Sequence, residues 1–250
     1  MSMLGPSFAI IIPIHNEAGF VSPALQQITA QVDDVARNYQ IILVENGSTD
    51  DTYAEASLCA DRDARVTVLH SDEPDYGLAM RKGMEFVEDR EWLVIFDIDY
   101  FSGAFVRRML EIGDTADIVI ASKRAPGSDD RRPFIRRLGT RVFNLILRRA
   151  LGSKVTDTHG IKGFRRTVVN DLLPDVFLGQ DLFDTELVLR AERLGYRIAE
   201  VPIVVEELRE ARSSYLRRIP RTLKGLRRLR RTLNSPPVSD GSSRSVTSSD

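Results

Sequence analysis

The amino-acid sequence predicts an α/β fold in which a mostly parallel central sheet is covered by helices on both faces. Short apolar runs alternate with amphipathic stretches of helical length through the first half of the chain. The apolar runs are almost uninterrupted, as expected of strands buried on both faces. The strand candidates are Phe8–Ile14, Gln40–Glu45, Val66–His70, Trp92–Asp97 and Ile118–Ser122.

Helices are predicted between these strands and through much of the second half. In the first half they lie near 18–37, 51–62, 77–89 and 103–113. The second half is more mixed, with a polar loop at 124–133, a helix near 134–150, a glycine-containing segment at 157–165, a helix at Asp181–Leu194 that closes at Gly195, and a strand at Ile198–Val205. In such sheets, ligands bind at the carboxyl ends of the strands.

Composition limits the class of protein. A chain of 250 residues with 42% hydrophobic content has room for one large domain or two small ones. The single cysteine, Cys59, excludes a disulfide framework and fits a reducing compartment. The apolar run Phe8–Ile14 is too short for a secretory leader, and no run approaches the roughly 18 residues of a membrane span. We therefore expect a cytoplasmic protein that is not integral to a membrane.

The charge is unevenly distributed along the chain. Residues 209–233 carry ten Lys or Arg side chains against one Glu, whereas residues 1–208 carry a net charge of −9. Apolar residues recur in the basic segment at steps of three and four, which predicts one apolar helical face. They are Leu216, Ile219, Leu223, Leu226, Leu229 and Leu233.

Three explanations compete for this basic helix, placed at 209–234. The preferred one is peripheral attachment to an anionic membrane surface. The second is packing on the protein's own acidic body. Nucleic acid is the third and least favoured, because Tyr215 is the only aromatic residue there and no binding module is recognised. Residues 1–208 are assigned to one domain, and 235–250 to a disordered tail.

The most informative stretch is the apolar run at 93–96, which ends in Asp97 and Asp99. Residues two apart on a strand point the same way, so the two carboxylates are expected to converge at the strand end. Carboxylate oxygens suit a divalent cation that also holds phosphates. The alternative is a turn in which both aspartates face water.

Two further strand ends carry polar residues. The second strand runs into Glu45-Asn-Gly-Ser-Thr-Asp50, where Ser48 or Thr49 could simply cap the next helix. Capping does not account for Glu45, which could accept a hydrogen bond from a nucleotide base or ribose. The first strand ends in Pro13-Ile-His-Asn-Glu17, where Asn16 could be another cap.

Taken in order and at this spacing, the three strand ends resemble the nucleotide-sugar half of family 2 glycosyltransferases, which have the GT-A fold. The second half continues the likeness in Asp157-Thr-His-Gly-Ile-Lys-Gly-Phe-Arg165, in Phe183-Asp-Thr-Glu-Leu187 and in Gly195 to Ile203. These segments look like the polyprenyl-phosphate sugar synthases, among them the dolichyl-phosphate mannose synthases. The resemblance covers about residues 6–215.

The resemblance implies a role for each matching residue. Pro13, Glu17 and Glu45 would line the nucleotide site. Asp97 and Asp99 would hold Mg²⁺ or Mn²⁺ and the donor diphosphate, with Asp99 as the catalytic residue. Arg136, or its neighbour Arg137, would meet a phosphate. The sequence departs from the family pattern at Asn46, where a second Asp is usual, and at Phe101, where Gln is common.

The implied reaction is an inverting transfer of a sugar from a nucleotide-diphosphate sugar, GDP-mannose or a UDP-sugar, to a polyprenyl phosphate. Two alternatives stay open. The acceptor could be a hydroxyl of a glycerolipid or sugar, with Asp181 or Asp184 as general base. The chain could also be a GT-A domain that binds nucleotide without turnover, given Asn46 and Phe101.

Overall fold

The computed structural model describes residues 6–131, 133–158, 160–177, 179, 182–205, 225–231 and 233. Seven strands form the main sheet in the order β3-β2-β1-β4-β7-β5-β8. They are β1 (Phe8–Ile14), β2 (Tyr39–Asn46), β3 (Val66–Ser71), β4 (Trp92–Ile95), β5 (Ile118–Ser122), β7 (Lys162–Arg165) and β8 (Ile198–Pro202). All neighbours pair in parallel except β7, which is antiparallel to β4 and β5.

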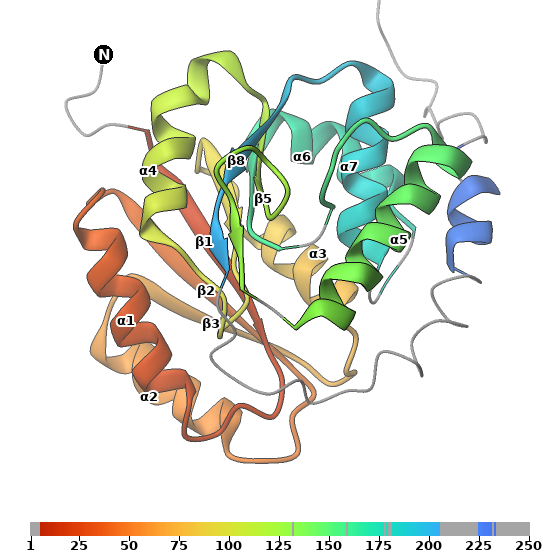
Figure 1. Ribbon diagram of the computed structural model, residues 1–250. Coiled ribbons are helices and arrows are strands. Elements are labelled where there is room, and N and C mark those ends of the chain that lie inside the picture. Colours follow the sequence, from red (N-terminus) through yellow and green to blue (C-terminus); the bar gives the residue numbers. More distant parts are fainter. Residues whose placement is uncertain are drawn as a thin grey trace, which may run out of the picture.

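Helices cover both faces of this sheet (Figure 1). On one face lie α1 (Val21–Asp33), α2 (Thr52–Arg62) and α4 (Gly103–Ile112), which pack on Ile10 and Ile12. On the other lie α3 (Tyr76–Phe86), α6 (Arg166–Leu172) and α7 (Phe183–Leu194), which pack on Ala9 and Ile11. Short 3₁₀ turns occur at Gly113–Thr115 and Leu173–Asp175. Because consecutive strand residues alternate between two covered faces, β1 is buried throughout, and the predicted α/β fold is confirmed.

The structure corrects three strand predictions. The strand predicted at Trp92–Asp97 ends at Ile95. The strand predicted at Ile198–Val205 breaks after Pro202, and β9 (Val204–Val205) pairs instead with the two-residue β6 (Asp129–Asp130) inside the predicted polar loop. The strand β7 was not predicted, because its four residues Lys-Gly-Phe-Arg show neither an apolar run nor strict alternation.

The long helix α5 (Phe134–Leu151) lies outside the main sheet, beside α7 (Figure 1). A third hydrophobic cluster joins α5 and α7 to the described C-terminal residues. It contains Leu147, Leu151, Leu182, Leu189, Leu226 and Leu229. The helical residues 225–231 therefore place their leucines against the body of the protein, as the second explanation for the basic segment requires, while Arg227, Arg228, Arg230 and Arg231 are exposed.

The remainder of the predicted basic helix (209–224, 232 and 234) and the predicted disordered tail (235–250) lie outside the described residues. Among the helices that the structure describes, none combines the length and the apolar character needed to cross a bilayer.

Candidate active site at the carboxyl edge of the sheet

The two aspartates singled out in the sequence lie in a tight turn rather than on a strand. Asp97 and Tyr100 form an isolated antiparallel bridge, in which each backbone N–H donates to the other residue's carbonyl, at 3.2 and 3.0 Å. Asp99 therefore sits in the two-residue loop of this turn and is exposed, while Asp97 is half-buried. The premise of same-side strand residues was wrong, and the turn brings the two carboxylates close enough to interact.

The electrostatics of Asp97 show an anionic centre. Burial raises its pKa to about 6, and the carboxylates of Asp99 and Asp184 act in the same direction. The ammonium of Lys162 opposes this shift, as does the Tyr76 hydroxyl, which donates to Asp97 Oδ1 at 3.3 Å. The carboxylates of Asp97, Asp99 and Asp184 repel one another, and a bound cation would reduce that repulsion.

Lys162 and Asp184 form a buried ion pair beside this centre. Lys162 is fully buried, and its Nζ donates to Asp184 Oδ2 and to the Gly160 carbonyl, both at 2.7 Å. The second oxygen of Asp184, Oδ1, is buried without a hydrogen-bond partner in the described structure. Because β7 is antiparallel to its neighbours, its first residue, Lys162, reaches the edge where the parallel strands end.

The donor set fits a divalent cation that binds together with a diphosphate. Within the residues that the structure describes, no three acidic, histidine or cysteine side chains form a metal site by themselves. Asp97 and Asp99 offer two carboxylates, and Mg²⁺ is commonly held by one or two carboxylates plus substrate phosphates and water. The assignment of the metal to these two residues remains a prediction.

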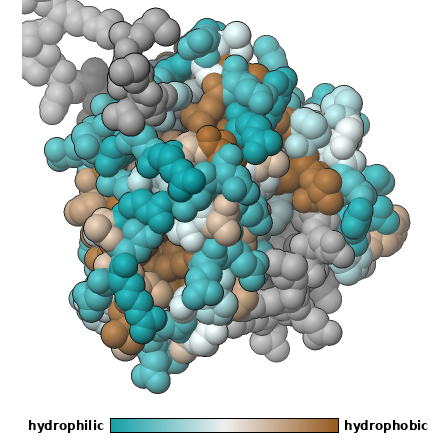
Figure 2. All heavy atoms as spheres, turned by 90° about the vertical axis from the view of Figure 1, so that its left-hand side faces the viewer, coloured by the Kyte–Doolittle hydropathy of each residue, from teal (hydrophilic) through white to brown (hydrophobic). Residues whose placement is uncertain are grey.

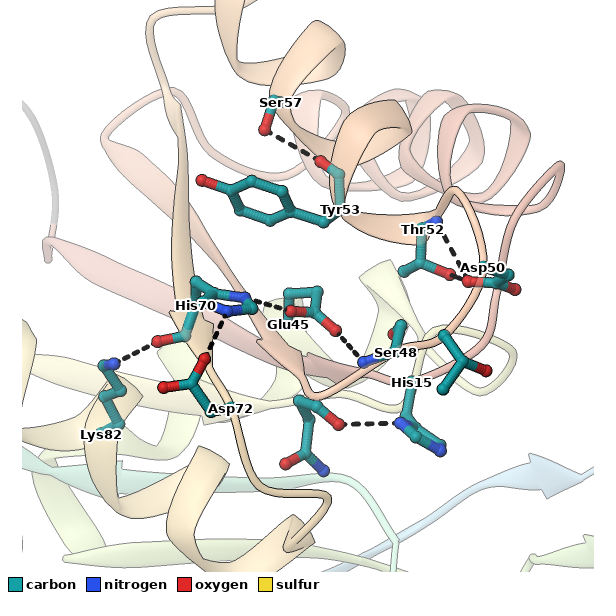
Figure 3. A network of polar contacts seen from close by, with 12 residues as sticks. His15, Glu45, Ser48, Asp50, Thr52, Tyr53, Ser57, His70, Asp72 and Lys82 are labelled. Atoms are coloured by element: carbon teal, nitrogen blue, oxygen red, sulfur yellow. Dashed lines mark hydrogen bonds and ion pairs between the residues drawn. The ribbon is translucent and has the colours of Figure 1, made fainter.

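Glu45 lies at the centre of a hydrogen-bond network at the end of β2 (Figure 3). Its side chain is buried, with Oε1 accepting from the Ser48 N–H and Oε2 from His70 Nδ1, both at 2.5 Å. Burial alone would raise the pKa of Glu45, but the hydrogen bonds from Ser48 and His70 outweigh it and hold that pKa below its ordinary value. Each carboxylate oxygen has a second lone pair, so Glu45 can still accept a bond from a nucleotide.

The loops that follow β1 and β2 are joined by reciprocal hydrogen bonds. His15 Nδ1 lies 2.7 Å from the Asn46 carbonyl, and the Asn16 N–H donates to Ser48 Oγ at 3.0 Å. Asn16 Oδ1 accepts from the Thr49 N–H at 2.8 Å. Asn16 adopts a left-handed φ of 54°, which asparagine tolerates better than most residues.

The capping alternatives are therefore wrong at both strand ends. The N-cap of α1 is Phe20 and that of α2 is Asp51, neither of which makes a side-chain capping bond. Asn16, Ser48 and Thr49 instead hold one loop against the other. Gly47 is required here because its φ is +62° and a side chain would meet the Asp72 carbonyl oxygen at 2.8 Å.

The other predicted site residues that the structure describes lie in β1, in the loop after it and at the start of α5. Pro13 is buried in β1, beyond Ile11, where the pairing with β4 ends. The half-buried Glu17 follows in the next loop, where its N–H donates to Thr52 Oγ1 at 2.6 Å. Arg137 is exposed in the first turn of α5, and Arg136 precedes it in the same turn. Asp181 lies outside the described residues.

Sequence reasoning missed three residues at this edge: Lys162, Tyr76 and His70. Lys162 reaches the site only because β7 runs antiparallel, a pairing that the local sequence does not reveal. Tyr76 comes from the start of α3, and its contact with Asp97 spans 21 residues. His70 ends the predicted third strand, so its place beside Glu45 could have been inferred from the parallel register of β2 and β3.

A mostly parallel sheet with one antiparallel strand, and with acidic residues just beyond the carboxyl end of a central strand, is the arrangement of the GT-A fold. The family comparison agrees: the chain belongs to glycosyl transferase family 2, whose family model matches residues 9–173. Solved structures share the fold. Glucosyl-3-phosphoglycerate synthase from Mycobacterium tuberculosis, in complex with Mg²⁺ and UDP, aligns with a TM-score of 0.68 and 20% identity over 94% of this chain and 82% of that one. The same enzyme was also crystallised with Mn²⁺, UDP-glucose and phosphoglyceric acid.

Curated relatives include enzymes named for polyprenyl-phosphate acceptors. Undecaprenyl-phosphate mannosyltransferase of Micrococcus luteus is 31% identical over 82% of this chain and 86% of that protein. Dolichyl-phosphate hexose transferase of Haloferax volcanii is 26% identical over 80% and 82%, respectively. Glycosyltransferase AglD of Haloferax volcanii is 28% identical over 80% of this chain, which spans only 33% of AglD.

Proposed function

We propose that this protein is an inverting, metal-dependent glycosyltransferase that moves a sugar from a nucleotide-diphosphate sugar to a polyprenyl phosphate. The observation that carries the proposal is the anionic centre at Asp97 and Asp99, on the edge where the loops after β1 and β2 are also joined. A divalent cation bound there would neutralise the departing nucleoside diphosphate. The names of the Micrococcus and Haloferax relatives support a lipid-phosphate acceptor.

The ion pair of Asp184 with Lys162 supports a phosphate acceptor over a hydroxyl. A phosphate oxygen is already anionic, so it can form the new bond to the anomeric carbon as the bond to the nucleoside diphosphate breaks, and no proton has to be removed. A hydroxyl acceptor would need a general base. Of the two candidates, Asp181 lies outside the described residues, and Asp184 is 7% exposed and ion-paired with the Lys162 ammonium. We therefore assign Asp184 to holding Lys162 in place.

Other residues of this edge have supporting roles. Pro13, Glu17 and Glu45 shape the nucleotide site, with Glu45 acting directly on the nucleotide or through the loop that it holds. Arg136 and Arg137, in the first turn of α5, would meet the acceptor phosphate. GDP-mannose and UDP-sugars are the donor candidates. Because Leu226 and Leu229 pack on the body of the protein, the basic C-terminal segment would attach the cytoplasmic enzyme peripherally to an anionic membrane through its exposed arginines.

A transfer assay with labelled donors and a short, water-soluble polyprenyl phosphate tests this proposal. We expect lipid-linked sugar to form with Mg²⁺ or Mn²⁺ and to be lost with chelator. Asp61→Asn, an exposed aspartate on α2, is the matched control for Asp97→Asn and Asp99→Asn. Transfer to a glycerolipid or sugar hydroxyl but not to the phosphate would replace the proposed acceptor. Nucleotide binding with no transfer to any acceptor would favour a non-catalytic domain.

A further inference from the structure

A cavity of about 620 Å³ lies between α3, α6 and the 3₁₀ turn that follows α6. It is at the edge of the sheet where the parallel strands begin, because β7 is antiparallel and its last residue, Arg165, pairs with Trp92 at the start of β4. The catalytic edge is at the other end of these strands. A volume of this size is typical of small-molecule sites, and the proposed reaction does not use this cavity.

One wall of the cavity is fixed by Arg81 on α3. Its Nη1 donates to the Leu173 carbonyl at 3.0 Å and its Nη2 to the Val176 carbonyl, so α3 is joined to the turn after α6. Arg81 Nη1 also lies 3.4 Å from a carboxylate oxygen of Glu85, one helical turn further along α3. Both terminal nitrogens of Arg81 are therefore engaged by the protein itself.

Arg166 lines the same cavity and leaves one edge of its guanidinium unpaired. Its Nη1 donates to the Met84 carbonyl at 3.0 Å and lies 3.4 Å from Asn170 Oδ1. In contrast, Nε and Nη2 are buried and have no hydrogen-bond partner in the described part of the chain. Buried donors of a charged group are costly to leave unpaired, so this edge calls for a partner.

The chemistry of this edge indicates what the partner is. Nε and Nη2 lie on the same side of the planar guanidinium, where their N–H bonds run parallel and match the two oxygens of a carboxylate. Burial lowers the pKa of Arg166, and the nearby Glu88 and Asp89 oppose that shift. A guanidinium keeps its proton at neutral pH in proteins, so the edge is cationic and suits an anion.

The acidic residues of the lining restrict the kind of anion. Glu85 and Glu88 both line the cavity and are exposed. Their negative charges disfavour a ligand with more than one anionic charge. Their oxygens, together with Asn170 Oδ1, can accept hydrogen bonds from hydroxyl groups.

We infer that this cavity binds a small hydroxycarboxylate, whose carboxylate receives two parallel hydrogen bonds from Nε and Nη2 of Arg166 and whose hydroxyls donate to the acidic side chains. Because both nitrogens are buried in this structure, the guanidinium turns toward the cavity as the ligand binds. The cavity and Asp97 lie at opposite edges of the sheet, so the inference goes beyond the proposed function and does not depend on it.

Calorimetric titration of the full chain, in chelator and without nucleotide, tests the site with matched probes. D-Gluconate carries one carboxylate and several hydroxyls, and sorbitol is the same polyol without the carboxylate. Glucose 6-phosphate carries a dianionic group instead. We expect saturable binding of gluconate, weaker binding of glucose 6-phosphate and none of sorbitol.

Two substitutions should change gluconate binding in opposite directions. Arg166→Lys keeps the positive charge but loses the parallel pair of donors, so the dissociation constant should rise roughly tenfold. Glu88→Gln removes a negative charge and keeps an acceptor oxygen, so the constant should fall roughly two- to fivefold.

Matched controls come from the other face of the sheet. The side of the molecule that carries α1, α2 and α4 faces the viewer in Figure 2, where the surface is largely hydrophilic with separate hydrophobic patches. Arg107→Lys and Glu111→Gln change two exposed residues of α4 and should leave the dissociation constant of gluconate unchanged.

Several results would overturn the inference. They are no saturable binding of gluconate, equal binding of sorbitol, tighter binding of glucose 6-phosphate, and an unchanged constant in a folded Arg166→Lys protein. Because Glu88 is exposed, an unchanged constant in Glu88→Gln decides against the site even where circular dichroism shows Arg166→Lys to be unfolded. Calorimetry requires no sugar transfer, so failure of this binding leaves the proposed function intact, and loss of transfer leaves this inference intact.

Discussion

Replacing Asp97 by asparagine should make the metal-free protein more stable and the enzyme inactive. The pKa of Asp97 rises from its ordinary value of 3.8 to about 6, chiefly through burial and then through Asp99 and Asp184. Each unit corresponds to 1.36 kcal/mol, so keeping Asp97 ionised costs the native state up to about 3 kcal/mol at neutral pH. Asparagine is neutral and keeps an oxygen that can accept from the Tyr76 hydroxyl. The half-burial of Asp97 reduces the expected gain to about 1–3 kcal/mol.

The size of this effect changes predictably with pH. Because the native state holds a proton on Asp97 more tightly than the unfolded chain does, the penalty is complete above about pH 6 and disappears as the pH falls toward 3.8. The stability gap between the variant and the unmodified protein should therefore shrink to about half at pH 5. Urea denaturation in chelator at pH 7.5 and at pH 5 measures both values, with Asp61→Asn as the exposed control.

The same variant should lose the stabilisation that Mg²⁺ and a nucleotide sugar give to the unmodified protein in a thermal-shift experiment. A metal-free Asp97→Asn protein that is less stable at pH 7.5 would show that the repulsion described above is absent. A variant that keeps metal-dependent donor binding would remove Asp97 from the metal site.

Four other substitutions test the remaining parts of the structure. Asp99→Asn should abolish transfer while leaving the urea midpoint within error of the unmodified protein, and near-normal transfer with unchanged metal dependence would exclude Asp99 as a ligand. Glu45→Ala should raise the donor dissociation constant roughly tenfold or more, since a hydrogen bond to a charged group contributes about 1.5–3 kcal/mol; an unchanged constant by calorimetry would make Glu45 a turn residue only. The hydrogen bond to Glu45 raises the pKa of His70 in the native state, so the charged pair stabilises the protein fully at pH 6 and progressively less as the pH rises. His70→Gln should therefore cost more stability at pH 6 than at pH 9, and a cost independent of pH would argue against the charged pair. Leu229→Ala should cost about 2–5 kcal/mol because this side chain is fully buried, and a negligible change would show that the C-terminal helix is not held against α5 and α7.

The sheet could be predicted from sequence wherever a strand is buried on both faces. The strands Phe8–Ile14 and Ile118–Ser122 have the predicted bounds. An uninterrupted apolar run has to be buried along its whole length, and a strand covered on both faces buries all of its residues. Local pattern failed where pairing is decided by distant partners. The strand β7 contains Lys162 and Gly163, whose places depend on Asp184 and Met109, and neither neighbour can be read from the segment itself.

In the candidate site, too, some residues could be predicted from local sequence, whereas the positions of others depend on distant partners. Asp97, Asp99 and Glu45 could be found because each lies at, or just beyond, the carboxyl end of a strand that the sequence predicts. The turn that positions Asp99 could not be predicted, because it depends on the backbone pairing of Asp97 with Tyr100. The basic segment was correctly predicted to be amphipathic over 225–231, and the structure shows that Leu226 and Leu229 pack with leucines of α5 and α7. The spacing of the leucines predicts one apolar helical face, but it does not show which surface covers that face.

The position of β7 also limits the order in which the chain can fold. In the sheet, β7 lies between β4 and β5, and β5 in turn carries β8. While the chain is being synthesised, β1 to β4 can pair with one another, but β5 has no partner until residues 162–165 have emerged. Until then β4 presents an unpaired edge of the kind through which partly made chains associate. Insertion of β7 thus joins β5 to the sheet and brings Lys162 to the catalytic edge in the same step, before β8 and Asp184 have been made.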